Sequence, residues 1–241
     1  MQWYGRTTCA HVCSWICFAL LALCGAYAIV KGVPRGPRSA ISRTSGSGGS
    51  GSGGGGGDTQ VYHRLEIAEL MTHPAHAKQR VLFLWALHQQ QLRPPSDPGS
   101  YYQLLGIHGA PFTAYREIAP PGPPCNPTKQ WCGYCHHGDS LFPTWHRAYL
   151  LFLERHLAAE AAAVAARLAR AQPGQAVKWH AAAAALRVPY WEFAGRGAAR
   201  QGVPRCFVQE STAVLDPDTG RPAVIPNPLR SQLLLATAWL P

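Results

Sequence analysis

Residues 131–154 read WCGYCHHGDSLFPTWHRAYLLFLE, and the interpretation of the whole chain starts from this stretch. Its first half places two cysteines and two adjacent histidines close together, and all four side chains are of kinds that bind metals. Its second half predicts a helix that begins at Pro143, because proline is favoured in the first turn of a helix. His146 then lies in that first turn, directly after the cysteines and histidines.

Helical patterns continue on both sides of this stretch. The run that starts at Pro143 is rich in alanine and leucine and stops at the Pro173–Gly174 pair. Upstream, apolar residues recur at helical spacing until Pro94 and Pro95 end the pattern. We therefore expect helices over residues 64–71, 75–91, 143–171 and 175–187.

A short helix, a loop and a hairpin complete the expected organisation. Ser100 is of a kind that caps helices, and the following YYQLLGI predicts a short helix that ends at His108. Residues 112–131 are rich in proline and lack periodicity, which indicates a loop. Two apolar segments flank the turn residues 216–220, so a β-hairpin is expected there and the fold class is mainly α. The two segments are residues 208–214 and 223–225.

Composition divides the chain into three parts. Hydrophobic residues make up 47% of the 241 residues, which suffices for a domain with its own core. Residues 31–57 consist mainly of Gly, Ser, Pro and Arg and predict a disordered, flexible linker. Residues 1–30 therefore form a separate segment, and residues 58–241 are expected to contain the folded domain.

The first part has the composition of a targeting segment. Residues 7–30 contain no Asp, Glu, Lys or Arg, and residues 16–28 have the length of the apolar core of a signal peptide. Residues 12–30 are also just long enough to span a bilayer. We expect a signal peptide or a membrane anchor, and hence a protein of the secretory pathway that is secreted or membrane-tethered.

The basic charge of the chain gives little support to a nucleic-acid partner. The formal net charge is +10, but the basic residues outside the linker are scattered. No run of Lys and Arg interleaved with aromatic residues occurs. We therefore expect a solvated basic surface and no nucleic acid among the partners.

Two redox chemistries match part of the cysteine and histidine cluster. Cys132 and Cys135 have the spacing of a redox-active disulfide, but that motif follows a buried strand, and the preceding PPGPPCNPTKQ cannot form one. The same cysteines followed by His136 have the spacing of a covalent haem attachment. Met71 is the candidate for the second axial ligand of such a haem.

Zinc and copper are the metals whose ligand preferences fit the cluster. A structural zinc could use Cys132, Cys135, His137 and His146, at a shorter interval than zinc fingers have. Copper favours imidazole nitrogens, and a site of three histidines leaves one face open for dioxygen or substrate. His108 at a helix end, His137 on a loop and His146 on a helix could converge on one copper. The residue pattern alone does not distinguish between a haem, a zinc site, a copper site and ordinary surface histidines that bind no metal.

Four motifs, taken in order, resemble the first copper region of fungal tyrosinases. The RLEI segment at Arg64 and the approach SYYQLLGIHG to the first histidine also match, so the resemblance covers residues 61–229. It implies a tyrosinase-like helical bundle around a copper site, with residues 58–241 as the N-terminal portion of a copper-binding domain. The four motifs are GIHGAPF (106–112), GYCHHGDSLFPTWHRAYLLFLE (133–154), VPYWEFA (188–194) and IPNPL (225–229).

The resemblance also implies roles for single residues. The three ligands of the first copper fall on His108, His137 and His146. Cys135 occupies the position of a cysteine that forms a thioether with the second ligand, which would fix the imidazole of His137. Phe142 matches an aromatic residue that packs beside the ligands.

The chain departs from the family pattern after Leu229. No His-x-x-x-His pair follows to supply the second copper, so one copper site of two is visible. His156 and His180 match no family ligand and are interpreted as ordinary helix residues. The family usually has Tyr-Trp-Asp-Trp where this chain has YWEF at residues 190–193, a conservative change in an expected strand.

The resemblance implies a copper oxidoreductase that hydroxylates monophenols and oxidises o-diphenols to o-quinones, as in melanin-type pigment synthesis. Its cofactor would be copper, with two ions in the full family, and its partners a phenolic substrate and dioxygen. Reduction of dioxygen to peroxide takes one electron from each copper, so half a site does not suffice. Two hypotheses follow: a truncated sequence of an active oxidase, or a short, inactive protein that binds a single copper.

Overall fold

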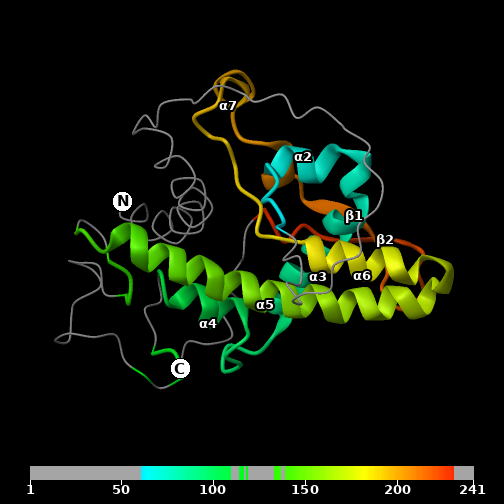
Figure 1. The fold of residues 1–241 in the computed structure, drawn as a ribbon, viewed down its shortest axis with the longest axis horizontal. Helices are drawn as coiled ribbons and strands as arrows, with labels where there is room; N and C mark the ends of the chain where they lie inside the picture. Colours follow the sequence, from blue (N-terminus) through cyan, green and yellow to red (C-terminus); the bar gives the residue numbers. More distant parts are fainter. Residues whose placement is uncertain (1–60, 110–113, 117, 119–132, 137–138, 231–241) are drawn as a thin grey trace, which may run out of the picture.

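The computed structural model describes residues 61–109, 114–116, 118, 133–136 and 139–230, which form a mainly helical fold with one small hairpin (Figure 1). The expected fold class is confirmed. The helices are α2 (Ile67–Thr72), α3 (Ala77–Leu92), α4 (Tyr101–Gly106), α5 (Phe142–Ala171), α6 (Ala176–Ala185) and α7 (Arg196–Gln201). The strands are β1 (Ser211–Leu215) and β2 (Pro222–Pro226), and short 3₁₀ turns occupy Pro74–His76, Pro173–Gln175 and Arg205–Phe207.

The predicted N-terminal segment and most of the predicted loop lie outside the described residues. This holds for the signal peptide or anchor at residues 1–30, for the linker at residues 31–57 and for residues 119–131 of the loop. In the part of the chain that the structure describes, no helix is long and apolar enough to cross a membrane. The membrane tether through residues 12–30 and the secretory localisation therefore stay predictions.

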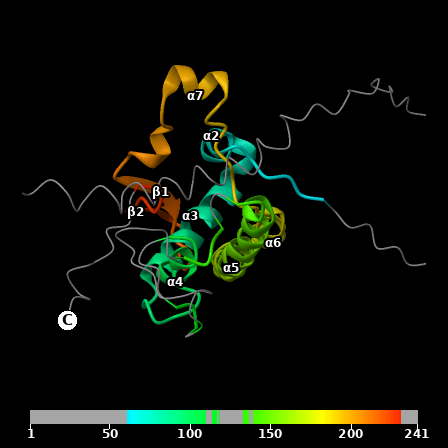
Figure 2. The same cartoon turned by 90° about the vertical axis from the view of Figure 1, so that its left-hand side faces the viewer.

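The hydrophobic core lies where α3 packs against the pair α5 and α6. These two helices lie side by side, joined by the 3₁₀ turn at Pro173, and α3 contacts both of them (Figures 1 and 2). Leu82 of α3 and Ala161, Ala165 and Leu168 of α5 are fully buried. The small alanine side chains let the neighbouring helices approach α5 closely. The apolar stripe that follows His146 thus continues into the core, far from the histidines.

Local signals place most helix ends within two residues of the expected positions. The Oγ of Ser100 accepts a hydrogen bond from the backbone N–H of Gln103 at 3.1 Å, which caps α4 as expected. The first helix is shorter than the predicted 64–71, because the Glu66 carboxylate caps it and accepts from the N–H of Ala68 at 2.6 Å. Helix α7 follows the glycine-containing segment after Phe193 and was not expected from periodicity.

Two of the family motifs, far apart in sequence, meet through a parallel β-bridge. The N–H of Ile67 donates to the carbonyl of Tyr190 at 2.7 Å, and the N–H of Tyr190 donates to the carbonyl of Leu65 at 3.0 Å. The strand expected at residues 190–193 is therefore wrong in extent, because its first residue alone pairs. The Glu154 carboxylate of α5 joins the same junction, accepting from the N–H of Val188 at 3.0 Å.

The hairpin β1–β2 is antiparallel, in register from Ser211 opposite Pro226 to Leu215 opposite Pro222. Its first strand starts later than the predicted segment 208–214, and its second strand extends one residue beyond the predicted segment 223–225 at each end. Its turn is stabilised by Asp216, whose Oδ1 accepts from the backbone N–H of Thr219 at 2.8 Å. Gly220 completes the turn with a φ of +66°. Its carbonyl accepts a hydrogen bond at 2.9 Å from Gln172, which follows α5, so the hairpin is attached to the end of the long helix.

Gly220→Ala tests this attachment. A Cβ there would sit 2.9 Å from Cγ of Gln172, and alanine disfavours positive φ. We expect the free energy of unfolding to fall by about 1–2 kcal/mol, as for a left-handed non-glycine residue. Gly174→Ala is the matched control, since a methyl group at that position would have no described heavy atom within 4 Å. Urea denaturation showing equal effects of both variants would contradict the argument.

Asn227 in the IPNPL motif closes the base of the hairpin. Its Nδ2 donates to the carbonyls of Cys206 at 2.7 Å and Gln209 at 2.8 Å, and its Oδ1 accepts from the N–H of Leu229 at 3.1 Å. The side chain is buried, with 5% of its residue surface exposed. One amide therefore satisfies three backbone groups of the surrounding chain.

Asn227→Ala should lower the free energy of unfolding by about 2–4 kcal/mol, because each buried polar group left without a partner costs about 1–3 kcal/mol. Gln209→Ala serves as control, since this position contributes its backbone carbonyl to the contact and keeps it in the variant. Its effect should stay within about 0.5 kcal/mol. Thermal or urea unfolding of the two variants decides the matter.

Candidate metal centre

His108 follows the short helix α4 and is turned into the interior. Its backbone N–H donates to the carbonyl of Leu105 at 3.0 Å, which continues the last turn of the helix. The residue is 2% exposed. The Ser100 cap sets where α4 begins, and the length of α4 then sets where His108 leaves it. The buried position of the His108 side chain therefore depends on where α4 ends.

His146 is the fifth residue of α5 and is equally buried, at 2% exposure. Its Nδ1 lies 2.7 Å from the carbonyl oxygen of Phe142, one turn earlier. A carbonyl only accepts, so Nδ1 carries the hydrogen and Nε2 of the neutral ring keeps its lone pair. Burial lowers the pKa of His146, while the Phe142 carbonyl acts in the opposite direction. The neutral ring, the form that binds metals, is therefore favoured.

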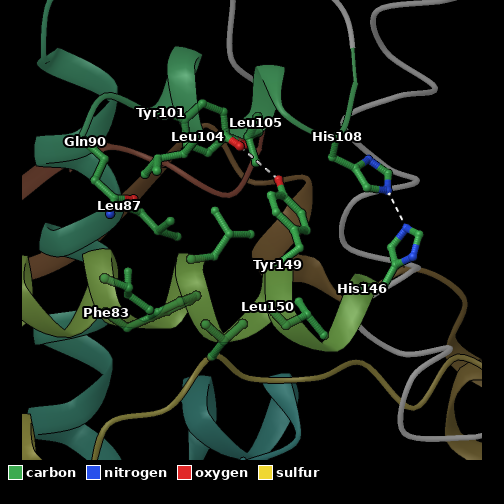
Figure 3. Close-up of a pocket in the computed structure, with 13 residues that line it drawn as sticks. Phe83, Leu87, Gln90, Tyr101, Leu104, Leu105, His108, His146, Tyr149 and Leu150 are labelled. Carbon is green, nitrogen blue, oxygen red and sulfur yellow. Dashed lines mark hydrogen bonds between the residues drawn. The ribbon is translucent and has the colours of Figure 1, made fainter. Parts of the chain in front are cut away.

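The two imidazoles converge. Nε2 of His108 lies 3.1 Å from Nε2 of His146, and the rings meet nearly edge to face (Figure 3). Imidazole nitrogens bind metal ions such as zinc at about 2.0–2.1 Å, so a separation near 3 Å lets one ion contact both nitrogens. Without an ion, one Nε2 must carry a hydrogen and donate to the other. The donor chemistry and spacing fit a metal that prefers imidazole.

Aromatic rings surround the two histidines. The Phe142 ring lies 4.2 Å from that of His146 between centroids, and the Tyr149 ring stacks on His108 at 5.5 Å. Trp145 contacts the rings of both His146, at 4.9 Å, and Tyr149, at 5.2 Å. Phe142 thus packs beside His146, and its role at a copper site stays a prediction. The aromatic side chains limit water at the nitrogens.

Cys135 lies against the same site from the loop that precedes α5. Its Sγ–H donates to the backbone carbonyl of His108 at 3.0 Å, and the residue is 7% exposed. Nearby, the N–H of Tyr134 donates to the carbonyl of Ile107 at 3.2 Å. The loop therefore runs alongside the end of α4. His137, the third predicted ligand, lies outside the described residues, so its coordination of copper and its bond to Cys135 stay predictions.

Three other described histidines, His136, His156 and His180, do not join this pair. His136 lies 2.8 Å from the Asp139 carboxylate through its Nδ1, in a solvent-exposed contact. His156 lies further along α5 against the ring of Phe152, and burial lowers its pKa. His180 is exposed on α6. Among the described residues, no group of three or more His, Cys, Asp or Glu could hold a metal.

An apolar cavity begins at the two histidines and extends between α3, α4 and α5 (Figure 3). Phe83, Leu104 and Leu150 are among the side chains that line it. One wall contains the amide of Gln90, which is 4% exposed and whose Nε2 has no hydrogen-bond partner among the described residues. The cavity, Gln90 and Tyr149 were missed from sequence. The spacing of three residues between His146 and Tyr149, which puts both on one helix face, was the available signal.

Comparison with known proteins agrees with the sequence motifs. A family model described as the common central domain of tyrosinase matches residues 98–237, more than half of the chain. Polyphenol oxidase 2 of Agaricus bisporus is 40% identical over 133 residues, which cover 55% of this chain and 22% of that protein. Tyrosinase of Aspergillus oryzae is 32% identical over 131 residues, covering 54% and 18%. The chain therefore spans about a fifth of the length of these curated relatives.

Solved structures share the fold. Latent and active mushroom tyrosinase aligns with a TM-score of 0.55 and 32% identity over 70% of this chain and 40% of that one. A copper-bound variant of active Aspergillus oryzae tyrosinase, complexed with L-tyrosine, aligns with a TM-score of 0.59 and 29% identity over 70% and 39%. The family match, the relatives and these neighbours show that the chain belongs to the tyrosinase family of type 3 copper proteins.

Proposed function

We propose that this chain supplies the first-copper half of a tyrosinase-type oxidase, with His108, His137 and His146 as the ligands of one copper. The observation that carries the proposal is the approach of two buried Nε2 atoms to 3.1 Å. Two neutral imidazoles held nitrogen to nitrogen lose favourable hydration, and a shared cation offsets that cost. The place of His137 as third ligand rests on the family motif.

The residues of the chain hold and shield the metal, while copper supplies the redox chemistry. The Phe142 carbonyl keeps the hydrogen of His146 on Nδ1 and so keeps Nε2 available as a donor. The rings of Phe142 and Trp145 pack against His146 and limit water at that nitrogen. A site of three histidines leaves coordination positions open for dioxygen.

The substrate we propose is a phenol, hydroxylated if it is a monophenol and oxidised to an o-quinone if it is an o-diphenol, as in pigment synthesis of the melanin type. Support comes from the L-tyrosine complex of one structural neighbour. A second copper is required, and the chain contains no further histidine after His180 to bind it. Turnover would therefore need a second copper-binding half. The apolar cavity beside His108 offers that half a surface to pack on.

Cys135 is proposed as the covalent tether of His137. Bond formation would remove the thiol hydrogen and one ring hydrogen, form a C–S bond and transfer two electrons to dioxygen. Support comes from the position of Cys135, whose buried sulfur already lies against the carbonyl of His108. After exposure to copper and air, the peptide that contains both residues should be lighter by two hydrogen atoms in mass spectrometry. The corresponding peptide of Cys135→Ser should keep the mass calculated from its own sequence, with no loss of hydrogen.

Metal titration tests the copper triad. The purified 241-residue chain should bind one copper, measured by competition with a chromophoric chelator. His108→Ala and His146→Ala should each weaken binding by at least about 10-fold, since even outer partners of a metal ligand contribute 10–100-fold. His180→Ala on exposed α6 should bind like the parent chain. Equal affinity in all four proteins would refute the assignment.

A catechol oxidation assay separates the two forms of the proposal. A chain that binds one copper and oxidises no catechol is the single-copper protein that the sequence motifs leave as an alternative. If the chain instead bound two coppers and oxidised catechol, residues outside the triad would supply the ligands of the second copper. The assay is repeated on a longer reading frame, where a second histidine-rich helix pair should restore turnover.

A further inference from the structure

The orientation of the His108 ring is not set by a helix, because His108 comes after α4 has ended. Its backbone is held by Leu105 and by the thiol of Cys135. Neither contact reaches the imidazole. Rotation about the bond between Cβ and the ring would turn Nε2 away from His146. A ligand must be held close to its productive orientation, so the contacts of the ring itself matter. Trp145 lies 6.3 Å from the imidazole between centroids but is tilted by 42° to it, which leaves a nearly parallel neighbour as the contact that best defines the ring plane.

Tyr149 supplies such a contact. Its ring lies nearly parallel to the imidazole of His108, with an interplanar angle of 18° and centroids 5.5 Å apart. This is an offset stack, a favourable arrangement of two aromatic rings. Rotating the imidazole would break the stack and drive the ring edge toward the tyrosine. The ring plane that keeps the stack is the plane in which Nε2 of His108 lies 3.1 Å from Nε2 of His146 (Figure 3).

Tyr149 is itself held in place at several points. Its hydroxyl donates to the carbonyl of Leu104 at 3.1 Å, in the helix that leads to His108. Its ring also stacks with Trp145 at 5.2 Å and 24°. The residue is 7% exposed. A tyrosine with its hydroxyl hydrogen-bonded and its ring packed has little freedom to move, which makes it a suitable support.

The position of Tyr149 on α5 links the two ligands. It lies three residues after His146, on the same face of the helix, and reaches across to the end of α4. We propose that Tyr149 is a positioning residue that orients the imidazole of His108 relative to His146. Its stack sets the ring plane, and its hydroxyl fixes the stack to the last turn of α4. The inference rests on the proposed function only in taking both histidines as ligands.

A purely structural role for Tyr149 makes different predictions. As an ordinary core residue it would hold α4 against α5, and its loss would lower stability without reorienting the His108 ring. Tyr149→Met removes the flat ring and the hydroxyl but keeps an apolar side chain of similar length. Tyr149→Phe keeps the ring and removes the bond to Leu104. Val164→Ala, a core substitution on α5 at a residue 2% exposed, controls for lost stability.

The first experiment uses the metal-free protein and does not depend on copper. NMR of the chain with labelled histidines should show a nuclear Overhauser effect between the rings of His108 and His146. We expect this signal to persist in Val164→Ala, to weaken in Tyr149→Phe and to vanish in Tyr149→Met. Its persistence in Tyr149→Met at parental strength would overturn the proposal. If Tyr149→Met does not fold, an unchanged signal in Tyr149→Phe overturns it instead.

The second experiment loads the same variants with Cu(II). We expect Tyr149→Met to weaken binding by about 10-fold or more, within the range seen for groups that support a metal ligand, and to change the EPR hyperfine splitting of the copper that remains bound. Val164→Ala should lower the unfolding temperature but leave the EPR spectrum unchanged. A parental EPR spectrum in Tyr149→Met would count against positioning.

The two experiments separate the two ideas. If the parent chain binds no copper, the proposed function fails, and the ring-to-ring signal of the metal-free protein still tests Tyr149. If the parent chain binds copper and the signal is insensitive to Tyr149, the positioning role fails while the copper triad stands.

Discussion

The close approach of two buried imidazoles is the constraint on which the rest of this structure depends. His108 and His146 are each 2% exposed, and their Nε2 atoms are 3.1 Å apart. Burial of polar rings is unfavourable unless each nitrogen finds a partner. The Phe142 carbonyl satisfies one nitrogen of His146, and the two Nε2 atoms face each other. In the metal-free chain the two Nε2 atoms share one hydrogen, and a cation that prefers imidazole would replace that hydrogen and bind both nitrogens.

Helix α5 connects this constraint to the core. His146 lies near its N-terminal end. Glu154, in its middle, accepts a hydrogen bond from the N–H of Val188. Ala165 and Leu168, toward its C-terminal end, are fully buried. Gln172, directly after the helix, holds the hairpin turn. Helix α5 thus connects the packed core to His146. Weaker packing at the far end of α5 costs stability, whereas altered contacts in its first two turns change the geometry of the nitrogens.

Much of the fold could be predicted because its signals are local. Ser100, Pro143 and the Pro173–Gly174 stop mark helix ends through capping and backbone geometry, and the structure follows them closely. The hairpin was found from its turn residues, and Asp216 caps that turn as its residue type suggests. The strand expected at Tyr190 was wrong in extent because its length depends on a partner that is distant in sequence. That partner is the segment at Glu66, and it stops being extended where Glu66 caps α2.

Two of the residues that meet at the candidate site could be predicted from sequence, and the residues that support them could not. His108 and His146 were identified through motifs, and the structure brings them together, while His137 lies outside the described residues. Tyr149 was not identified, because its role depends on a stack between two helices and sequence spacing alone does not report the facing helix. The same holds for Gln90, which looks like any polar helix residue until its neighbours are known to be apolar.

Gln90, His108 and His146 line one cavity, so a segment that covers the cavity would also contact the candidate metal centre. Nε2 of Gln90 has no acceptor in the part of the chain that the structure describes, and a buried amide N–H left so costs about 1–3 kcal/mol. A segment that covers the cavity and offers a carbonyl or hydroxyl would therefore be favoured at that point. The cavity walls are α3, α4 and α5; His108 follows α4, and His146 lies on α5. A covering segment that shifts α4 against α5 would also change the separation of the Nε2 atoms. Assembly of the second half and affinity of the first copper are therefore expected to be coupled through the contact between these two helices.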